Sequence, residues 1–285
     1  MFTRFARSWE LTKECWALLA RNKVLVIFPI LSGLASLAIM ISFAVPIFMT
    51  GSASQFQRVA QHSQATPQTY LLLFAFYFCL YLVQTFFNCA LMGAANVAFA
   101  GGQASLGIGL SLAWERFGRI VVWAAVAATV GMILRTLEER AGLIGKIVIA
   151  LLGAAWTILT YFMGPVIVFE DLGVSEGLAR STALIKKTWG EGMGKALTFS
   201  ALTLVGMLAL IVSFFLLLFV NPILAILSFV AGFIALVTVL SAMDGIFKVA
   251  LYRYACWNMV PDGFSAELVQ GAFLPKKKSR LSFGS

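Results

Sequence analysis

Long apolar runs alternate with short polar segments along most of the chain. Six runs approach or exceed the roughly 20 residues that a helix needs to cross a hydrocarbon core of about 30 Å. The third run spans the core only if Arg119 and Arg135 extend toward opposite interfaces, and otherwise it is tilted or re-entrant. The pattern predicts an all-α, polytopic membrane helix bundle with six transmembrane helices, in one integral membrane domain over residues 1–285. The six runs cover residues 24–49, 70–100, 120–134, 147–169, 197–220 and 223–243.

Only Asn221 and Pro222 separate the last two runs. A continuous helix through both runs would be about 70 Å long, more than twice the thickness of the hydrocarbon core. Asn tolerates the left-handed backbone that ends a helix, and Pro fits the first turn of the next helix. We therefore expect a tight helical hairpin at this dipeptide.

Residues 1–23 predict an amphipathic helix. Apolar and aromatic side chains recur at steps of three or four residues, and charged side chains occupy the opposite arc. Two interpretations are open: the helix lies in the plane of the inner headgroup region, or it packs on the protein's own cytoplasmic side. A cleavable signal peptide is not expected, because the next apolar run exceeds the roughly 7 to 15 residues of such a segment. The apolar face comprises Phe2, Phe5, Trp9, Thr12, Trp16 and Leu19.

Each odd-numbered run follows a short basic leader that contains a tryptophan. Indole side chains favour the boundary between acyl chains and water. We therefore interpret Trp9, Trp16, Trp114 and Trp189 as interfacial anchors. The recurrence fits a threefold repeat of a leader plus a helical hairpin, but separate selection for Trp and Arg at the inner interface explains it as well.

Composition excludes several classes of protein. Hydrophobic residues make up 61% of the chain and charged residues 12%, against about 45 to 50% and about 25% in soluble domains. The mean hydropathy of +0.93 also excludes a disordered chain and a coiled-coil rod. A membrane protein remains.

The basic residues are distributed by side of the membrane. If both termini are cytoplasmic, 17 of the 21 Lys and Arg residues lie inside, and only Arg58, Arg135, Arg140 and Lys146 lie outside. Cytoplasmic segments accumulate Lys and Arg, so we expect both termini, with a tail over residues 251–285, on the cytoplasmic side of a prokaryotic inner membrane. The net charge of +9 then reflects topology. No nucleic-acid partner is expected, because no groove-reading motif accompanies the charge.

Residue types that carry catalysis or hold metals are scarce. The one histidine, His62, falls in a polar loop outside the predicted spans. The four cysteines have neither the spacing of metal ligands nor that of a disulfide framework. We therefore predict no catalytic residue, no metal, no cofactor and no enzymatic activity.

Polar residues inside the spans are the best binding candidates, because burying them in lipid is costly unless they pair or face water. Gln84 and Asn88 lie one turn apart on the second span. They form either a stripe that contacts a solute or a set of interhelical hydrogen bonds. Asp244 and Lys248 lie one turn apart near the inner end of the last span, where we expect an i to i+4 ion pair.

Further charges gather at the same inner face in the predicted topology, namely Glu170, Asp171 and Arg180. With Asp244 and Lys248 they either bind a lipid headgroup or form a structural network that holds the leaders on the bundle. These five residues, with the two amides, are our ligand- or lipid-binding candidates.

Two segments resemble known sequences. Residues 164–189, GPVIVFEDLGVSEGLARSTALIKKTW, and residues 8–35, SWELTKECWALLARNKVLVIFPILSGLA, resemble uncharacterised prokaryotic six-span membrane proteins. Those proteins are similar to the membrane domain of some glycerophosphodiester phosphodiesterases and to YciC-like inner-membrane proteins. The resemblance implies a helical membrane protein of unknown activity. It brings no catalytic residues, because phosphodiesterase chemistry resides in a separate soluble barrel domain.

Two functions remain open. The first is a non-enzymatic membrane assembly or scaffold protein, whose leaders and small-residue ladders organise lipid, other subunits or copies of itself as a homo-oligomer. The alternative is a transporter or channel for a lipid or small solute. In that case Gln84, Asn88 and the charged cluster around Asp244 would line the path. We prefer the first, because no charge pair lies at the middle of the predicted membrane.

Overall fold

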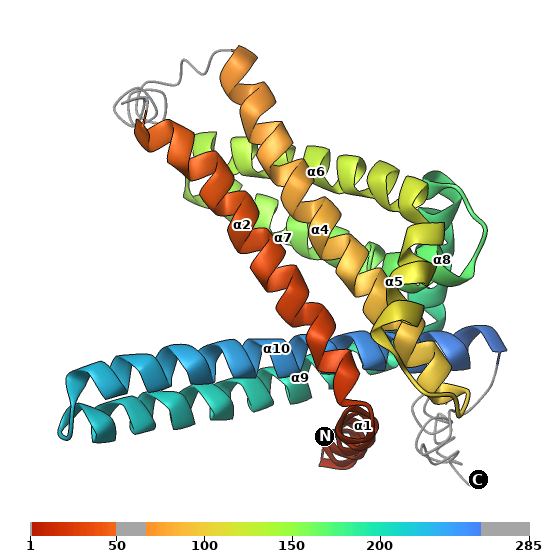
Figure 1. Ribbon diagram of the computed structural model, residues 1–285. Coiled ribbons are helices and arrows are strands. Elements are labelled where there is room, and N and C mark those ends of the chain that lie inside the picture. The colour runs from red at the N-terminus through yellow and green to blue at the C-terminus, as the bar shows by residue number, and fades with distance from the viewer. Residues whose placement is uncertain (1, 50–66, 258–285) are drawn as a thin grey trace, which may run out of the picture.

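The computed structural model describes residues 2–49 and 67–257, without the side chains of residues 2–11, 46–49, 69, 187–201, 254 and 257. All regular secondary structure in these ranges is helical. In chain order the elements are α1 (Phe2–Arg21), the short 3-10 helix η1 (Lys23–Val26), α2 (Ile27–Met49), α4 (Pro67–Phe99), α5 (Leu106–Glu115), α6 (Phe117–Arg140), α7 (Leu143–Leu159), α8 (Met163–Phe169), α9 (Val174–Leu218) and α10 (Pro222–Trp257) (Figure 1).

The long helices follow one another in three pairs that are consecutive along the chain: α2 with α4, α6 with α7, and α9 with α10. A leader precedes each pair, namely α1, α5 and the first turns of α9, in the order that the sequence predicted. The central helix is α4, which contacts α2, α5, α6, α8 and α10. Figure 1 shows the α9–α10 hairpin pointing away from the α2–α4 pair.

The buried core lies at one end of the helix pairs, and we call this end the base. It is built mainly from residues 89–99 of α4, residues 162–168 at α8 and residues 242–255 of α10. The other ends of α2, α7, α9 and α10 expose large apolar side chains. In a bilayer such surfaces contact acyl chains, whereas protein packing holds the base together.

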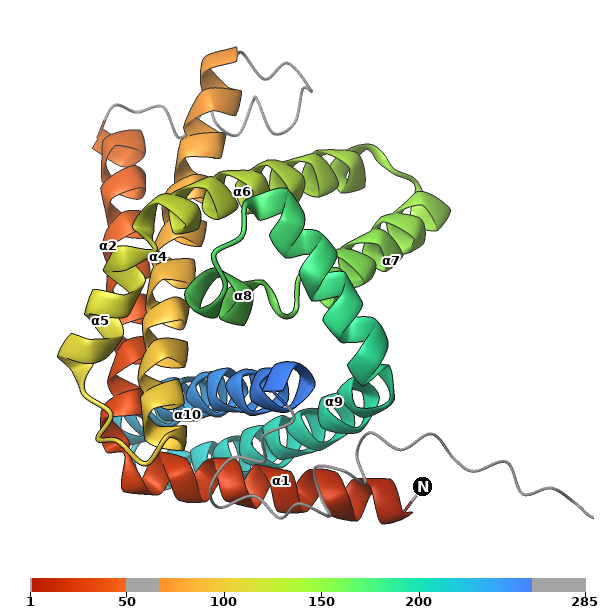
Figure 2. The same ribbon diagram turned by 90° about the vertical axis from the view of Figure 1, so that its right-hand side faces the viewer.

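The first leader packs across the last hairpin. α1 contacts both α9 and α10 and runs beneath them in Figure 2. Its side chains Thr12, Cys15 and Leu19 are buried, while Trp16 is 53% exposed. Over its described side chains, α1 therefore packs on the protein itself, with Trp16 at the edge of the contact.

The second leader is held close to α4 by a glycine. A Cβ atom on Gly109 would lie 2.5 Å from Phe28 Cζ and 2.6 Å from the backbone oxygen of Ala90. Only glycine permits this approach of α5 to α4. Ser105 caps the same helix, because its Oγ accepts a hydrogen bond from the backbone N–H of Ile108 at 3.2 Å.

The turn between α9 and α10 occurs at the predicted dipeptide. Asn221 Oδ1 accepts hydrogen bonds from the backbone N–H groups of Ile223 at 2.8 Å and Leu224 at 3.2 Å, so it caps the start of α10. The tip is otherwise apolar, and the Phe219 side chain is 90% exposed.

Five helical segments in the described residues are long and apolar enough to cross a membrane. They correspond to five of the six predicted spans. The predicted span 197–220 falls in the second part of α9, where the described side chains form an apolar portion over Leu202–Leu218. The five segments are Lys23–Val45, Tyr70–Phe99, Phe117–Arg140, Leu143–Phe169 and Pro222–Arg253.

Two predicted spans differ from the helices observed. The run 120–134 forms part of the 24-residue helix α6, which is about 36 Å long. The helix continues past the run because charged residues at its end form an i to i+4 ion pair, with Arg135 Nε 3.1 Å from Glu139 Oε1. The run 147–169 is interrupted between α7 and α8. Pro165 explains the interruption, since a helix interior would lose a hydrogen bond there, whereas the first turn of α8 tolerates proline.

The last two helices are longer than the apolar runs predicted. The leader over residues 174–195 does not form a separate helix but continues into the 45-residue helix α9. Its glycines weaken a helix without ending it, because no left-handed cap or chain reversal follows them. α10 continues past residue 243 to Trp257, so residues 251–257, at the start of the predicted tail, are helical.

Candidate functional site

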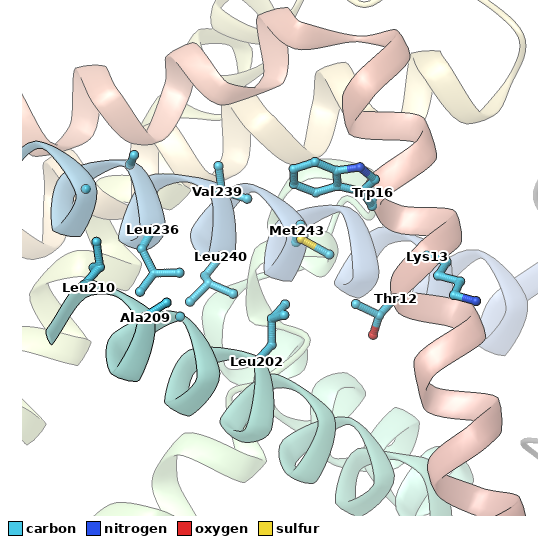
Figure 3. A pocket seen from close by; sticks show the side chains of 13 residues that line it. Thr12, Lys13, Trp16, Leu202, Ala209, Leu210, Leu236, Val239, Leu240 and Met243 are labelled. Carbon is cyan, nitrogen blue, oxygen red and sulfur yellow. The ribbon is translucent and has the colours of Figure 1, made fainter. Parts of the chain in front are cut away.

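A groove of about 620 Å³ lies between α1, α9 and α10 (Figure 3). The residues that α9 and α10 contribute to it carry hydrocarbon side chains, a thioether or no side chain at all. α1 contributes Thr12, Lys13 and Trp16 at one end of the groove. The sequence had marked Trp16 only as an anchor, and it gave no signal for Lys13. The remaining lining residues are Leu202, Gly206, Ala209, Leu210, Gly232, Ala235, Leu236, Val239, Leu240 and Met243.

A second cavity, of about 600 Å³, lies between α2, α4 and α10. Gln84 and Asn88 both line it, so the predicted stripe faces one space between helices. Hydroxyl side chains from the other two helices join them, namely Ser32, Ser36, Thr238 and Ser241. This cavity offers uncharged donors and acceptors, which suit a neutral polar group or water.

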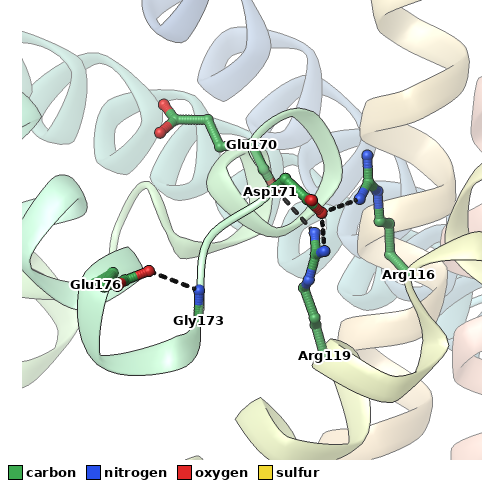
Figure 4. A network of polar contacts seen from close by, with 6 residues as sticks. All are labelled: Arg116, Arg119, Glu170, Asp171, Gly173 and Glu176. Carbon is green, nitrogen blue, oxygen red and sulfur yellow. Dashed lines mark hydrogen bonds and ion pairs between the residues drawn. The ribbon is translucent and has the colours of Figure 1, made fainter.

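The charged candidates lie at the base, and the first of them, Asp171, holds two arginines (Figure 4). Its Oδ1 accepts hydrogen bonds from Arg116 Nη1 at 2.9 Å and from Arg119 Nη2. Arg119 Nη1 also donates to the backbone oxygen of Glu170 at 3.0 Å. Because Asp171 is largely exposed, these bonds add little stability, but they fix the loop after α8 against the start of α6.

The second charged candidate, Glu170, links three elements. Arg180 Nε of α9 donates to both carboxylate oxygens, at 2.9 and 3.1 Å. The Tyr252 hydroxyl of α10 donates to Oε1 at 2.6 Å. The hydrogen bond from Arg180 to the carboxylate raises the pKa of that guanidinium above its usual range.

The start of α9 is fixed by two further contacts. Glu176 Oε2 accepts a hydrogen bond from the backbone N–H of Gly173 at 3.2 Å (Figure 4). Ser181 is fully buried, and its Oγ donates to the backbone oxygen of Leu159 at 2.6 Å and accepts from the N–H of Phe162 at 3.1 Å. Ser181 therefore satisfies the backbone at the break between α7 and α8. The segment that carried the family resemblance includes this serine, but its role was not predicted.

Asp244 and Lys248 form the predicted pair, with Lys248 Nζ 2.8 Å from Asp244 Oδ2. Lys248 also lies over the ring of Tyr161, 5.1 Å from its centroid, a cation–π contact. One turn further along α10, Arg253 Nη1 donates to Asn96 Oδ1 of α4 at 2.7 Å. These contacts tie the C-terminal part of α10 to α4 and to the turn before α8.

The structure thus places the five charged candidates in three sets of contacts, each satisfied largely by protein groups. Arg116, Arg119 and Tyr252 complete these sets and were not predicted, because they lie 50 to 80 residues away in sequence. Among the described residues, no group of three or more His, Cys, Asp or Glu side chains could hold a metal ion.

The four predicted anchors are described only in part. Trp16 and Trp114 are both more than half exposed, and Trp114 stacks on Phe117 with ring centroids 4.9 Å apart. The side chains of Trp9 and Trp189, like the loop with His62, lie outside the described residues.

Comparisons with known proteins lead to a family whose function is unknown. No curated protein and no solved structure matches the chain, and nothing found links it to glycerophosphodiester phosphodiesterases or YciC-like proteins. A family model described as a family of unknown function, DUF6159, matches residues 68–261. The match spans α4 to α10. It includes Gln84 and Asn88 of the second cavity and the charged contacts of the base. The chain therefore belongs to the DUF6159 family.

Proposed function

We propose that this protein is a non-enzymatic scaffold of a prokaryotic inner membrane. In this proposal the base lies at the cytoplasmic face with both termini, and six spans in three hairpins reach from it into the bilayer. The 17 to 4 division of basic residues supports this orientation.

The observation that carries the proposal is the pairing of charges at the base. Glu170 binds Arg180, Asp171 binds Arg116 and Arg119 at the start of α6, and Asp244 binds Lys248 within α10. The first two of these sets join different elements, and side chains that neutralise one another in this way hold those elements in place. They make a firm platform, and the apolar surfaces of the hairpins are then available to lipid, other subunits or further copies of the chain.

Copy number tests the scaffold function. The full chain is released from lipid nanodiscs in a native mass spectrometer, and its mass is compared with that of a variant carrying Trp9→Ala and Trp16→Ala. We expect a defined oligomer for the wild type and loss of that oligomer in the variant. A wild type that is monomeric at every concentration contradicts the scaffold function.

One observation favours the transport alternative, namely the cavity that Gln84 and Asn88 share with four hydroxyl side chains. A transport path through it must admit water from at least one side. The reaction of an introduced cysteine with a water-soluble thiol reagent decides between the two functions. The four native cysteines are first removed from the protein.

The probe is a charged, membrane-impermeant methanethiosulfonate reagent. Ser36→Cys places a thiol in the cavity, and Ala38→Cys places one on the same helix outside it. A scaffold leaves both thiols unreacted in intact vesicles. Selective reaction of Ser36→Cys supports transport and contradicts a purely structural role.

A further inference from the structure

The groove between α1, α9 and α10 has the shape and chemistry of a lipid site. Its volume of about 620 Å³ lies within the roughly 300 to 1,000 Å³ of pockets that hold small ligands. It opens along the surface of the α9–α10 hairpin, whose exposed side chains are apolar. A molecule that occupies it must therefore be compatible with a bilayer.

The wall of the groove excludes a polar solute. None of the ten lining residues from α9 and α10 carries a hydroxyl, amide or charged group. Close packing of the two helices leaves the groove between their side-chain ridges, since a Cβ on Gly206 would lie 2.7 Å from Leu236 and one on Gly232 would lie 2.4 Å from Leu210. An aliphatic chain packs against such a wall without burying a polar group.

One end of the groove has the opposite character. There α1 contributes Lys13, which is an exposed residue, the half-exposed Trp16 and the buried Thr12 (Figure 3). Lysine binds phosphate as a point charge, and indole lies at the boundary between headgroups and acyl chains. The α1 end therefore carries the one basic residue among those that line the groove.

The length of the groove matches one leaflet. Along α10 the lining residues extend from Gly232 to Met243 beside α1, a rise of about 16 Å. Half of the hydrocarbon core measures about 15 Å. An acyl chain that begins at α1 would thus follow the groove to the middle of the bilayer.

We propose that this groove binds one anionic phospholipid, with an acyl chain along α9 and α10 and the phosphodiester beside Lys13. The site lies within a single chain, so it does not depend on the scaffold function. Lipid retention and copy number are separate masses in the same spectrum, and either proposal can fail without the other.

The test uses the full chain in nanodiscs that contain equal amounts of phosphatidylglycerol and phosphatidylcholine. Native mass spectrometry counts the lipids that each protein retains. We expect the wild type to retain one phosphatidylglycerol in preference to phosphatidylcholine. Lys13→Gln should lower this preference about fivefold, the effect of one charge near the membrane surface, and Lys13→Arg should restore it. Lys23→Gln, which removes an exposed cation outside the groove, is the matched control.

A second pair of variants tests the acyl-chain wall. Ala209→Phe fills the groove, whereas Leu208→Phe enlarges an exposed side chain next to it. We expect the first to lose the retained lipid and the second to keep it. Three outcomes would each overturn the proposal. They are equal lipid retention by Ala209→Phe and Leu208→Phe, equal preference for phosphatidylglycerol in Lys13→Gln and wild type, and a lipid-free dimer that covers the groove.

Discussion

Replacing Tyr252 with Phe tests whether the base is held by its polar contacts. The Tyr252 ring is fully buried, and its hydroxyl donates to Glu170 Oε1 at 2.6 Å. The variant keeps the ring and its contact with Phe169, whose centroid is 5.4 Å away. It removes only the hydroxyl, so the change in the free energy of unfolding reports on the polar contacts of that hydroxyl, with Glu170 and with Cys256.

The expected loss follows from the partner's charge. Hydrogen bonds to charged groups contribute about 1.5 to 3 kcal/mol. Glu170 keeps its bonds to Arg180 after the substitution, so no carboxylate is left unpaired and we expect a loss near the lower limit, about 1.5 kcal/mol. Unfolding by sodium dodecyl sulfate in mixed micelles, followed by tryptophan fluorescence, measures this free energy.

The matched control is Tyr70→Phe, which removes a hydroxyl that accepts a long, exposed bond of 3.5 Å from Arg140. We expect a change within about 0.5 kcal/mol for it. In a background with Glu170→Ala, Tyr252→Phe should also have little effect, because the acceptor is gone. Equal losses from Tyr252→Phe with and without Glu170 would refute the assignment.

Three further substitutions extend the test to other contacts, measured by the same unfolding assay. Ser181→Ala should lower the free energy of unfolding by about 1 to 3 kcal/mol, because the buried N–H of Phe162 and the carbonyl of Leu159 lose their partner. Thr182→Ala, which loses a bond within its own helix, should cost less, and a larger loss there would contradict the role of Ser181. Gly109→Ala should destabilise by about 1 to 3 kcal/mol through overpacking, whereas Gly107→Ala, which faces open space, should be neutral or stabilising; similar values for the two would show that α5 does not pack as described. Asn221→Ala should cost about 0.5 to 2 kcal/mol by removing the cap of α10, and Asn221→Ser, which retains a capping oxygen, should recover most of it.

The parts of the fold that the sequence predicts well depend on local spacing. Asn221 and Pro222 predict the reversal because the two apolar runs around them are together too long for one span. Asp244 and Lys248 predict their ion pair because four residues make one helical turn. In both cases the information lies within a few residues.

The parts that the sequence does not predict depend on distant packing. Nothing near Asp171 indicates that its partners are Arg116 and Arg119, since tertiary contacts alone bring them together. The groove beside Lys13 exists only because α1 crosses α9 and α10. Apolar patterns also underestimate the lengths of α9 and α10, because charges end an apolar run without ending a helix.

The self-capped turn at Asn221 has a consequence for how the protein enters the membrane. No Asp, Glu, Lys, Arg or His occurs from Leu202 to Met243, and the side chain of Asn221 is engaged by the backbone of its own hairpin. Moving this tip through hydrocarbon therefore requires the desolvation of no ionised group. The final hairpin can pass from the insertion machinery into the bilayer as one unit, with both helices paired before the tip reaches the far side.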